Sequence, residues 1–82
     1  MVCIRFWAGA REVAGVAEQS LGAGSLTEVL AALRREHGPR MEALLSISVL
    51  LLDGGQVARD ADVDVPDGST LEVLPPYAGG SR

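Results

Sequence analysis

The chain has 82 residues, of which 48% are hydrophobic and 22% charged, so it has room for one globular domain with a small core. Eleven acidic residues outweigh seven basic ones, all arginine, and the net charge of −4 argues against nucleic acid as a partner, since phosphate binding needs clustered cations. A single cysteine excludes an internal disulfide, and neither a secretory signal pattern nor an apolar run of roughly 20 residues is present, so we expect a cytoplasmic protein without a membrane partner.

The first expected elements form a pair of strands. Apolar residues occupy every second position from Val2 to Phe6, which predicts a strand over Val2–Trp7 with one buried face. A short helical turn over Ala10–Ala14 follows. The chain then returns as a second, weaker strand over Val16–Leu21, and the two strands are expected to pair.

The strongest signal in the sequence is an amphipathic helix that begins after Ser25. Ser25 and Glu28 form a capping box, in which each side chain bonds the backbone N–H of the other residue. Gly38 and Pro39 end the helix, because glycine tolerates the left-handed conformation and proline does not continue the helix. Four side chains at spacings of three and four residues form its apolar face: Leu26, Val29, Leu30 and Leu33.

Three further strands are expected after the helix. The first covers Ile47–Leu52 and is closed by an Asp53-Gly54 turn, because this dipeptide adopts the positive φ angles of tight hairpins. A short edge strand lies near Gln56–Ala58, followed by an irregular crossing. The last strand covers Ser69–Leu74, and two of its side chains are expected on one face: Leu71 and Val73.

This order of elements predicts an α+β fold. One long helix with a single apolar face is best buried against one face of a mixed sheet built from the strands before and after it. We therefore expect a β-grasp, or ubiquitin-like, domain over residues 1–74, with the last strand beside the first in the middle of the sheet. Residues 75–82 are expected to form a flexible tail.

The expected tail contains residues suited to threading into another protein. Pro75 and Pro76 favour an extended chain and end the sheet ladder, because proline has no backbone N–H to donate. Gly79 and Gly80 have no Cβ, so the backbone there fits a narrow channel and approaches a reactive atom closely. From Pro75 to Gly80 the tail spans roughly 20 Å when extended, at about 3.3 Å per residue.

The chain resembles the MoaD/ThiS family of ubiquitin-like sulfur carriers. The resemblance rests on "FWAGAREVAG" near the start and "DGSTLEVLPPYAGG" near the end, together with the β-grasp order and the length, and it is strongest toward the MoaD branch, the small subunit of molybdopterin synthase. It implies a carrier that is a substrate rather than an enzyme. An E1-like adenylating enzyme, using ATP and Mg, would activate the carboxyl of Gly80, which would then become a thiocarboxylate. The chain itself would bind no cofactor.

The resemblance also implies a partner that accepts the sulfur. In the MoaD branch this is the large subunit of molybdopterin synthase, whereas relatives serve thiamin, cysteine or secondary-metabolite biosynthesis. Ser81 and Arg82 follow Gly80 in this sequence, so a processing protease removes them, or they are foreign to the native protein, or the carrier function is absent. A ubiquitin-like protein modifier and an inert interaction module remain as alternatives.

Apolar residues fall on both faces of the strand over Ile47–Leu52, although only one face can cover the helix. If Trp7, Leu50, Leu52 and Leu74 share the outer face, they form an exposed patch suited to partner docking. Burial of this patch under loops or against a crystal neighbour is the alternative.

No residue cluster in the sequence predicts a catalytic or metal site. His37, in the last turn of the helix, is interpreted as structural because no second metal ligand lies near it in the sequence. Cys3 is interpreted as a small apolar residue of the first strand. Asp60 begins a run of aspartates, but the sixth and twelfth positions from it hold Val65 and Leu71 rather than the glycine and glutamate of a calcium loop. We expect a solvated acidic loop and no bound metal.

Overall fold

The computed structural model describes residues 1–76, so the predictions for Gly79 and Gly80 lie outside the described residues. The elements follow in this order: β1 (Val2–Phe6), α1 (Gly9–Ala14), β2 (Glu18–Leu21), β3 (Gly24–Ser25), α2 (Leu26–His37), α3 (Pro39–Leu45), β4 (Val49–Leu52), β5 (Gly55–Val57), β6 (Asp64–Val65) and β7 (Thr70–Leu74).

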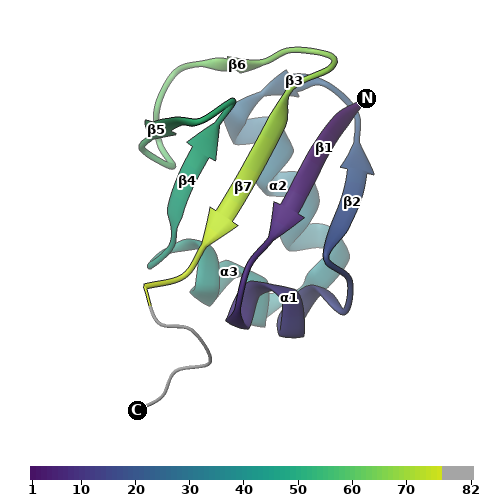
Figure 1. Cartoon of the computed structure of the whole chain (residues 1–82), viewed down its shortest axis with the longest axis vertical. Helices are drawn as coiled ribbons and strands as arrows, with labels where there is room; N and C mark the ends of the chain where they lie inside the picture. Colours follow the sequence, from purple (N-terminus) through teal and green to yellow (C-terminus); the bar gives the residue numbers. More distant parts are fainter. Residues whose placement is uncertain (77–82) are drawn as a thin grey trace.

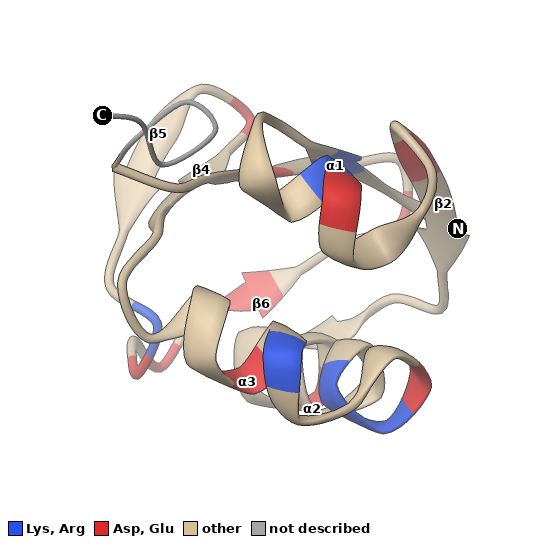
Figure 2. Cartoon of the chain, turned by 90° about the horizontal axis from the view of Figure 1, so that it is seen from below, with Lys and Arg blue, Asp and Glu red and all other residues tan. Residues whose placement is uncertain are grey.

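Five strands form one mixed sheet in the order β2-β1-β7-β4-β5. β1 and β7 run parallel at its centre, and the other neighbours are antiparallel. Figure 1 shows this sheet in front and α2 crossing behind it, and Figure 2 shows the helices α2 and α3 as a separate layer. The arrangement is the β-grasp fold, and it confirms the predicted α+β class, including the central position of the last strand.

The helix α2 begins as the sequence predicts. The Ser25 hydroxyl accepts a hydrogen bond from the Glu28 N–H at 3.1 Å, and the Glu28 carboxylate accepts one from the Ser25 N–H at 2.9 Å. This capping box satisfies two backbone donors that the first turn would otherwise leave open. All four residues of the predicted apolar face are buried.

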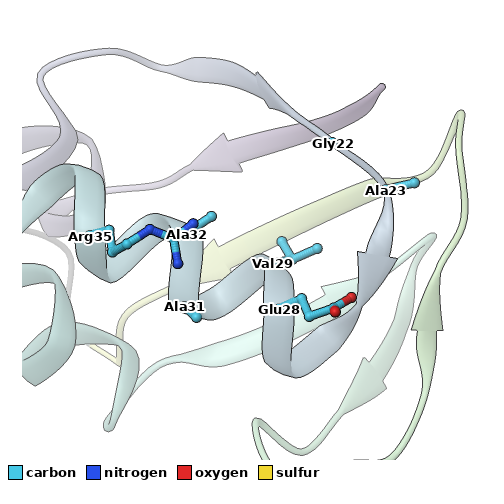
Figure 3. A pocket seen from close by; sticks show the side chains of 7 residues that line it. All are labelled: Gly22, Ala23, Glu28, Val29, Ala31, Ala32 and Arg35. Atoms are coloured by element: carbon cyan, nitrogen blue, oxygen red, sulfur yellow. The ribbon is translucent and has the colours of Figure 1, made fainter.

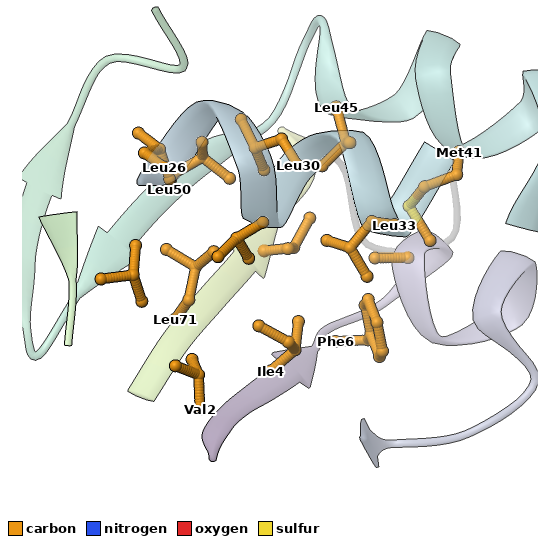
Figure 4. Packing of buried hydrophobic residues seen from close by; sticks show 14 residues of the cluster. Val2, Ile4, Phe6, Leu26, Leu30, Leu33, Met41, Leu45, Leu50 and Leu71 are labelled. Carbon is orange, nitrogen blue, oxygen red and sulfur yellow. The ribbon is translucent and has the colours of Figure 1, made fainter. Parts of the chain in front are cut away.

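The core lies between α2 and the sheet. It also takes in Met41 and Leu45 of α3, Ala10 of α1, and Val65 of β6. Figure 4 shows side chains from α2 meeting those of β1 and β7, with Val2 at the lower end of the cluster and Phe6 at its right, below Leu33. None of the helices in residues 1–76 is long and apolar enough to cross a membrane.

The region between Gly38 and Val49 differs from the prediction. Pro39 ends α2 as expected, but it also starts the helix α3, because proline is favoured in a first turn, where its missing N–H has no acceptor within the helix. Ile47 then lies in a turn, so the strand predicted from Ile47 begins only at Val49. The extra helix contributes Met41 and Leu45 to the core, beside α2 and the sheet.

The remaining turns and strand ends shift by small amounts. Asp53 and Gly54 have φ angles of 49° and 86°, which confirms the hairpin turn between β4 and β5. β1 ends at Phe6 rather than Trp7, and β2 begins at Glu18 rather than Val16. The segment predicted as an irregular crossing contains β6, which pairs with β3 across Gly24–Val65 and Ser25–Asp64.

Candidate functional site

The outer face of the sheet, which points away from α2, carries a group of apolar side chains. Residues on this face pair between β4 and β7: Val49 with Leu74, and Leu51 with Glu72. Trp7 continues the outward alternation of β1, and its ring lies against Arg5 on this face. We refer to Trp7, Val49, Leu51 and Leu74 as the outer-face patch.

The predicted placement of Leu50 and Leu52 on this face is wrong. Leu50 pairs with Val73 and Leu52 with Leu71, and both partners face the core. Leu50 is only 1% exposed and Leu52 is half-buried against the core cluster. Because side chains alternate along a strand, assigning Leu50 to the wrong face also misplaced its neighbours Val49 and Leu51.

The apolar side chains of the outer-face patch are partly exposed to solvent. Trp7 is 36% exposed and Val49 is 40% exposed, while Leu51 and Leu74 are half-buried. Ile47, at 60% exposed, lies in the turn before Val49. Contiguous exposed apolar surface is typical of interaction sites, so the outer-face patch is a candidate docking surface.

Arg5 brings charge to the middle of this face. Its guanidinium lies 3.4 Å from the Glu18 carboxylate and 3.7 Å from the Glu72 carboxylate, and it stands 5.0 Å from the centre of the Trp7 ring. These side chains are partly exposed, so each ion pair adds at most about 1 kcal/mol of stability. Arg5 thus places a cation beside the Trp7 ring and two carboxylates on the outer face.

The outer-face patch lies at the end of β7, where the chain leaves the sheet. Leu74 is the last residue of β7, and Pro75 and Pro76 follow it directly. Neither proline has an N–H with which to extend the ladder. The Trp7 N–H donates to the Val73 carbonyl at 3.1 Å, so the end of β1 lies beside the point where the tail begins. The tail residues Gly79 and Gly80 follow outside the described part of the chain.

Ala8 follows Trp7 in a conformation that alanine rarely adopts. Its φ of 50° and ψ of −124° suit the first central position of a type II′ turn, where glycine is preferred, and the Ala10 N–H donates to the Trp7 carbonyl at 2.9 Å across that turn. Such strain persists only where surrounding contacts hold it. Sequence reasoning missed this feature, because the strain appears only in the backbone angles.

Cys3 lies on the outer face of β1, with its sulfur 3.8 Å from a Glu18 carboxylate oxygen. Partial burial raises the pKa of the Cys3 thiol, and the negative charge and hydrogen bonding of Glu18 raise it further, while Arg5 opposes them. A raised pKa disfavours the thiolate, which is the nucleophilic form of cysteine. This environment fits the predicted apolar role of Cys3 rather than a reactive one.

His37 joins α2 to the sheet. Its Nε2 lies 2.6 Å from the Gln19 side-chain oxygen, and its ring meets Phe6 edge to face with the ring centres 5.9 Å apart. The Gln19 amide also donates to the Glu36 carboxylate at 3.0 Å. These contacts support the structural interpretation of His37. Within residues 1–76, no group of three or more His, Cys, Asp or Glu side chains has a metal-binding arrangement.

The comparisons with known proteins agree with the fold and the sequence resemblance. No protein-family profile matches the chain. A molybdopterin synthase sulfur carrier subunit from Chlamydomonas reinhardtii is 33% identical over 79 residues, which cover 94% of this chain and 95% of the relative.

Solved structures show the same fold. The small archaeal modifier protein 1 from Methanosarcina acetivorans superposes with a TM-score of 0.77 at 21% identity, covering 96% of this chain and 95% of that one. A chain in the complex of subunits 1 and 2 of the molybdopterin-converting factor from Helicobacter pylori superposes with a TM-score of 0.68 at 24% identity, covering 96% and 97%.

The sequence identity to the algal carrier extends over nearly the full length of both chains. The strand order of the sheet is that of the β-grasp fold, as expected for a ubiquitin-like protein. The chain therefore belongs to the MoaD/ThiS family of ubiquitin-like sulfur carriers, whose small subunits carry sulfur and are not themselves catalysts.

Proposed function

We propose that this chain carries sulfur for molybdopterin synthesis on the carboxyl group of Gly80. The observation that supports this most strongly is its near full-length similarity to a molybdopterin synthase sulfur carrier subunit. Ser81 and Arg82 follow Gly80 in the sequence, so the proposal includes cleavage after Gly80 by a protease. The carboxylate that this cleavage frees is the group to be activated.

The proposed chemistry needs two steps on that carboxylate. An oxygen of the carboxylate attacks the α-phosphorus of ATP, bound with Mg²⁺ on an E1-like enzyme, and pyrophosphate leaves. Hydrosulfide then attacks the acyl carbon, AMP leaves with the bonding electrons of the acyl C–O bond, and loss of the S–H proton gives the thiocarboxylate. Because a free carboxylate is a poor electrophile, the first step makes the second possible. The chain supplies only the reacting carboxyl group and binds no cofactor of its own.

The outer-face patch is the proposed docking surface for partner enzymes. Leu74 belongs to the patch and is followed directly by the prolines that begin the tail. A partner bound to the patch therefore also receives the start of the tail. Trp7 and Val49 offer the most exposed apolar area of the patch, and buried aromatic side chains often dominate the binding energy of interfaces. The proposed partners are the adenylating enzyme and the large subunit of molybdopterin synthase.

A reconstituted assay tests this proposal. The full chain and a shortened chain that ends at Gly80 are each incubated with the adenylating enzyme of the same organism, Mg²⁺ and ATP, and ATP–pyrophosphate exchange is measured. We expect exchange with the shortened chain only, because Gly80 has no free carboxylate while Ser81 and Arg82 follow it. Absence of exchange with a folded shortened chain would contradict the carrier function.

Two variants of the shortened chain then test the docking face. Leu51→Asp places a charge in the outer-face patch, whereas Thr27→Asp places one on exposed α2 and serves as the matched control. We expect the Leu51 variant to raise the KM for the carrier and the control to leave it unchanged. Addition of sulfide, the large subunit and the pterin precursor tests the final acceptor, since molybdopterin should form only with the thiocarboxylated carrier.

A further inference from the structure

The strand β2 is an edge strand with free hydrogen-bonding groups. Among residues 1–76 it pairs only with β1, and Figure 1 labels no strand on its far side. The Phe6 N–H donates to the Ala17 carbonyl at 2.9 Å, which places the residue pairs Ile4–Gln19 and Val2–Leu21 in the hydrogen-bonded positions of this antiparallel ladder. The backbone groups of the alternate residues Glu18 and Ser20 therefore point away from β1, at the open edge of the sheet.

A hollow lies beside the end of this edge. It has a volume of about 520 Å³ and opens to solvent between α2 and the segment that leaves β2. Figure 3 shows Gly22 and Ala23 on that segment, with Glu28 and Arg35 along α2 on the other side. The remaining lining residues are small or apolar: Val29, Ala31 and Ala32. The hollow can therefore accept side chains that project from a strand laid along β2.

Side-chain contacts fix the spacing between β2 and α2 at one end. Gln19 of β2 contacts both Glu36 and His37 of α2, at 3.0 Å and 2.6 Å. Gln19 and His37 are both partly buried. The strand edge and the helix are thus kept at a fixed spacing before any partner arrives, which lowers the entropy cost of binding.

The charges around the hollow favour an acidic partner residue at one end. Arg35 is exposed and makes no ion pair with any residue in 1–76, whereas the Glu28 carboxylate already accepts the Ser25 N–H. A helix docked here would leave the open backbone groups of β2 unused. An added strand would satisfy them and place every second side chain toward the hollow.

We propose that the edge of β2 and the hollow beside α2 form a second docking site, which binds an extended segment of a partner protein by strand addition. The segment carries small β-branched residues at alternate positions and a carboxylate that meets Arg35. This site is separate from the outer-face patch and the tail, because β2 lies at one edge of the sheet and the tail leaves from the central strand β7. A carrier could therefore bind such a segment while its tail is engaged elsewhere.

The test uses the full chain, labelled with ¹⁵N, and two synthetic peptides: acetyl-Thr-Val-Thr-Val-Thr-Asp-amide and the same residues in reverse order. The two orders cover antiparallel and parallel addition. We expect one of them to shift the amide resonances of Ser20, Gly22 and Ala32 in a saturable manner. No saturable shift with either peptide at millimolar concentration, or shifts confined to the outer-face patch, would overturn the proposal.

Two pairs of variants separate the parts of the site. Ala32→Gln fills the hollow and should weaken binding, whereas Ala43→Gln on exposed α3 should not. Arg35→Gln should weaken binding about 2–5-fold, as expected for an exposed ion pair of up to about 1 kcal/mol, and Arg40→Gln should leave it unchanged. Replacing the peptide aspartate by asparagine should abolish the difference in affinity between Arg35→Gln and the unaltered chain.

Equal affinities across each pair of variants would contradict strand addition at this site. Neither result depends on sulfur transfer, so failure here leaves the carrier proposal standing.

Discussion

Replacing two neighbouring residues of β4 by alanine tests the assignment of its faces. Leu50 is 1% exposed and faces α2, whereas Val49 is 40% exposed on the outer face. Leu50→Ala removes a fully buried side chain and leaves a cavity, for which about 3 kcal/mol is expected within a range of about 2–5 kcal/mol. Val49→Ala removes partly exposed methyl groups, and about 1 kcal/mol or less is expected.

These magnitudes are large against the stability of a domain of 82 residues, which is about 4–12 kcal/mol at about 0.05–0.15 kcal/mol per residue. Leu50→Ala should therefore lower the Tm by about 12–24 °C, taking about 4–8 °C per kcal/mol for a domain of this size. Val49→Ala should lower it by less than about 8 °C. In the assay of the KM for the carrier, the order of the two effects should reverse. At temperatures where both variants are folded, Val49→Ala should raise this KM more than Leu50→Ala does.

Urea unfolding, followed by circular dichroism and by the fluorescence of Trp7, measures both costs. Trp7 is the only tryptophan and lies on the outer face, so the two signals report on different parts of the domain. Coincident transitions would support two-state unfolding and allow the free energies to be compared. An equal loss for the two variants, or a larger loss for Val49→Ala, would refute the register described above.

Three further changes have expected outcomes. Ala8→Gly relieves the turn strain and should raise the stability by about 1 kcal/mol, or the Tm by about 4–8 °C, measured by calorimetry; a lower Tm would contradict the strain. Because the pKa of the Cys3 thiol is raised, its alkylation by iodoacetamide should begin at higher pH than that of a free thiol, and Glu18→Gln should move the rate profile to lower pH; an unchanged profile would argue against the role of Glu18. Ser25→Ala removes half of the capping box and should cost about 1 kcal/mol in urea unfolding, whereas the exposed Thr27→Ala should cost less; equal costs would exclude the cap as a source of stability.

The sequence predicts the helix α2 and the central strands well because their signals are local. The capping box of Ser25 and Glu28 and the spacing of the apolar face follow from helix geometry alone. The alternation in β1 and the Asp53-Gly54 turn likewise depend on residues adjacent in the chain. From these elements the β-grasp order follows, since a single apolar helix face needs one sheet to cover it.

The outer-face patch could be predicted only in part because strand register depends on distant partners. β4 carries leucine or valine at all four positions, so its own sequence does not show which face is buried. The pairing of Leu50 with Val73, 23 positions away, decides it. The helix α3 was missed for a similar reason, since Gly38 and Pro39 serve both as a helix end and as a helix start.

The carrier proposal is tested most directly by the intact mass of the protein isolated without a tag from its own cells. We predict a species that ends at Gly80, together with a heavier form in which sulfur replaces one oxygen of the terminal carboxyl. The heavier form should disappear when the gene for the adenylating enzyme is deleted. Finding only species in which Ser81 and Arg82 still follow Gly80, under conditions of high molybdopterin demand, would contradict the carrier proposal.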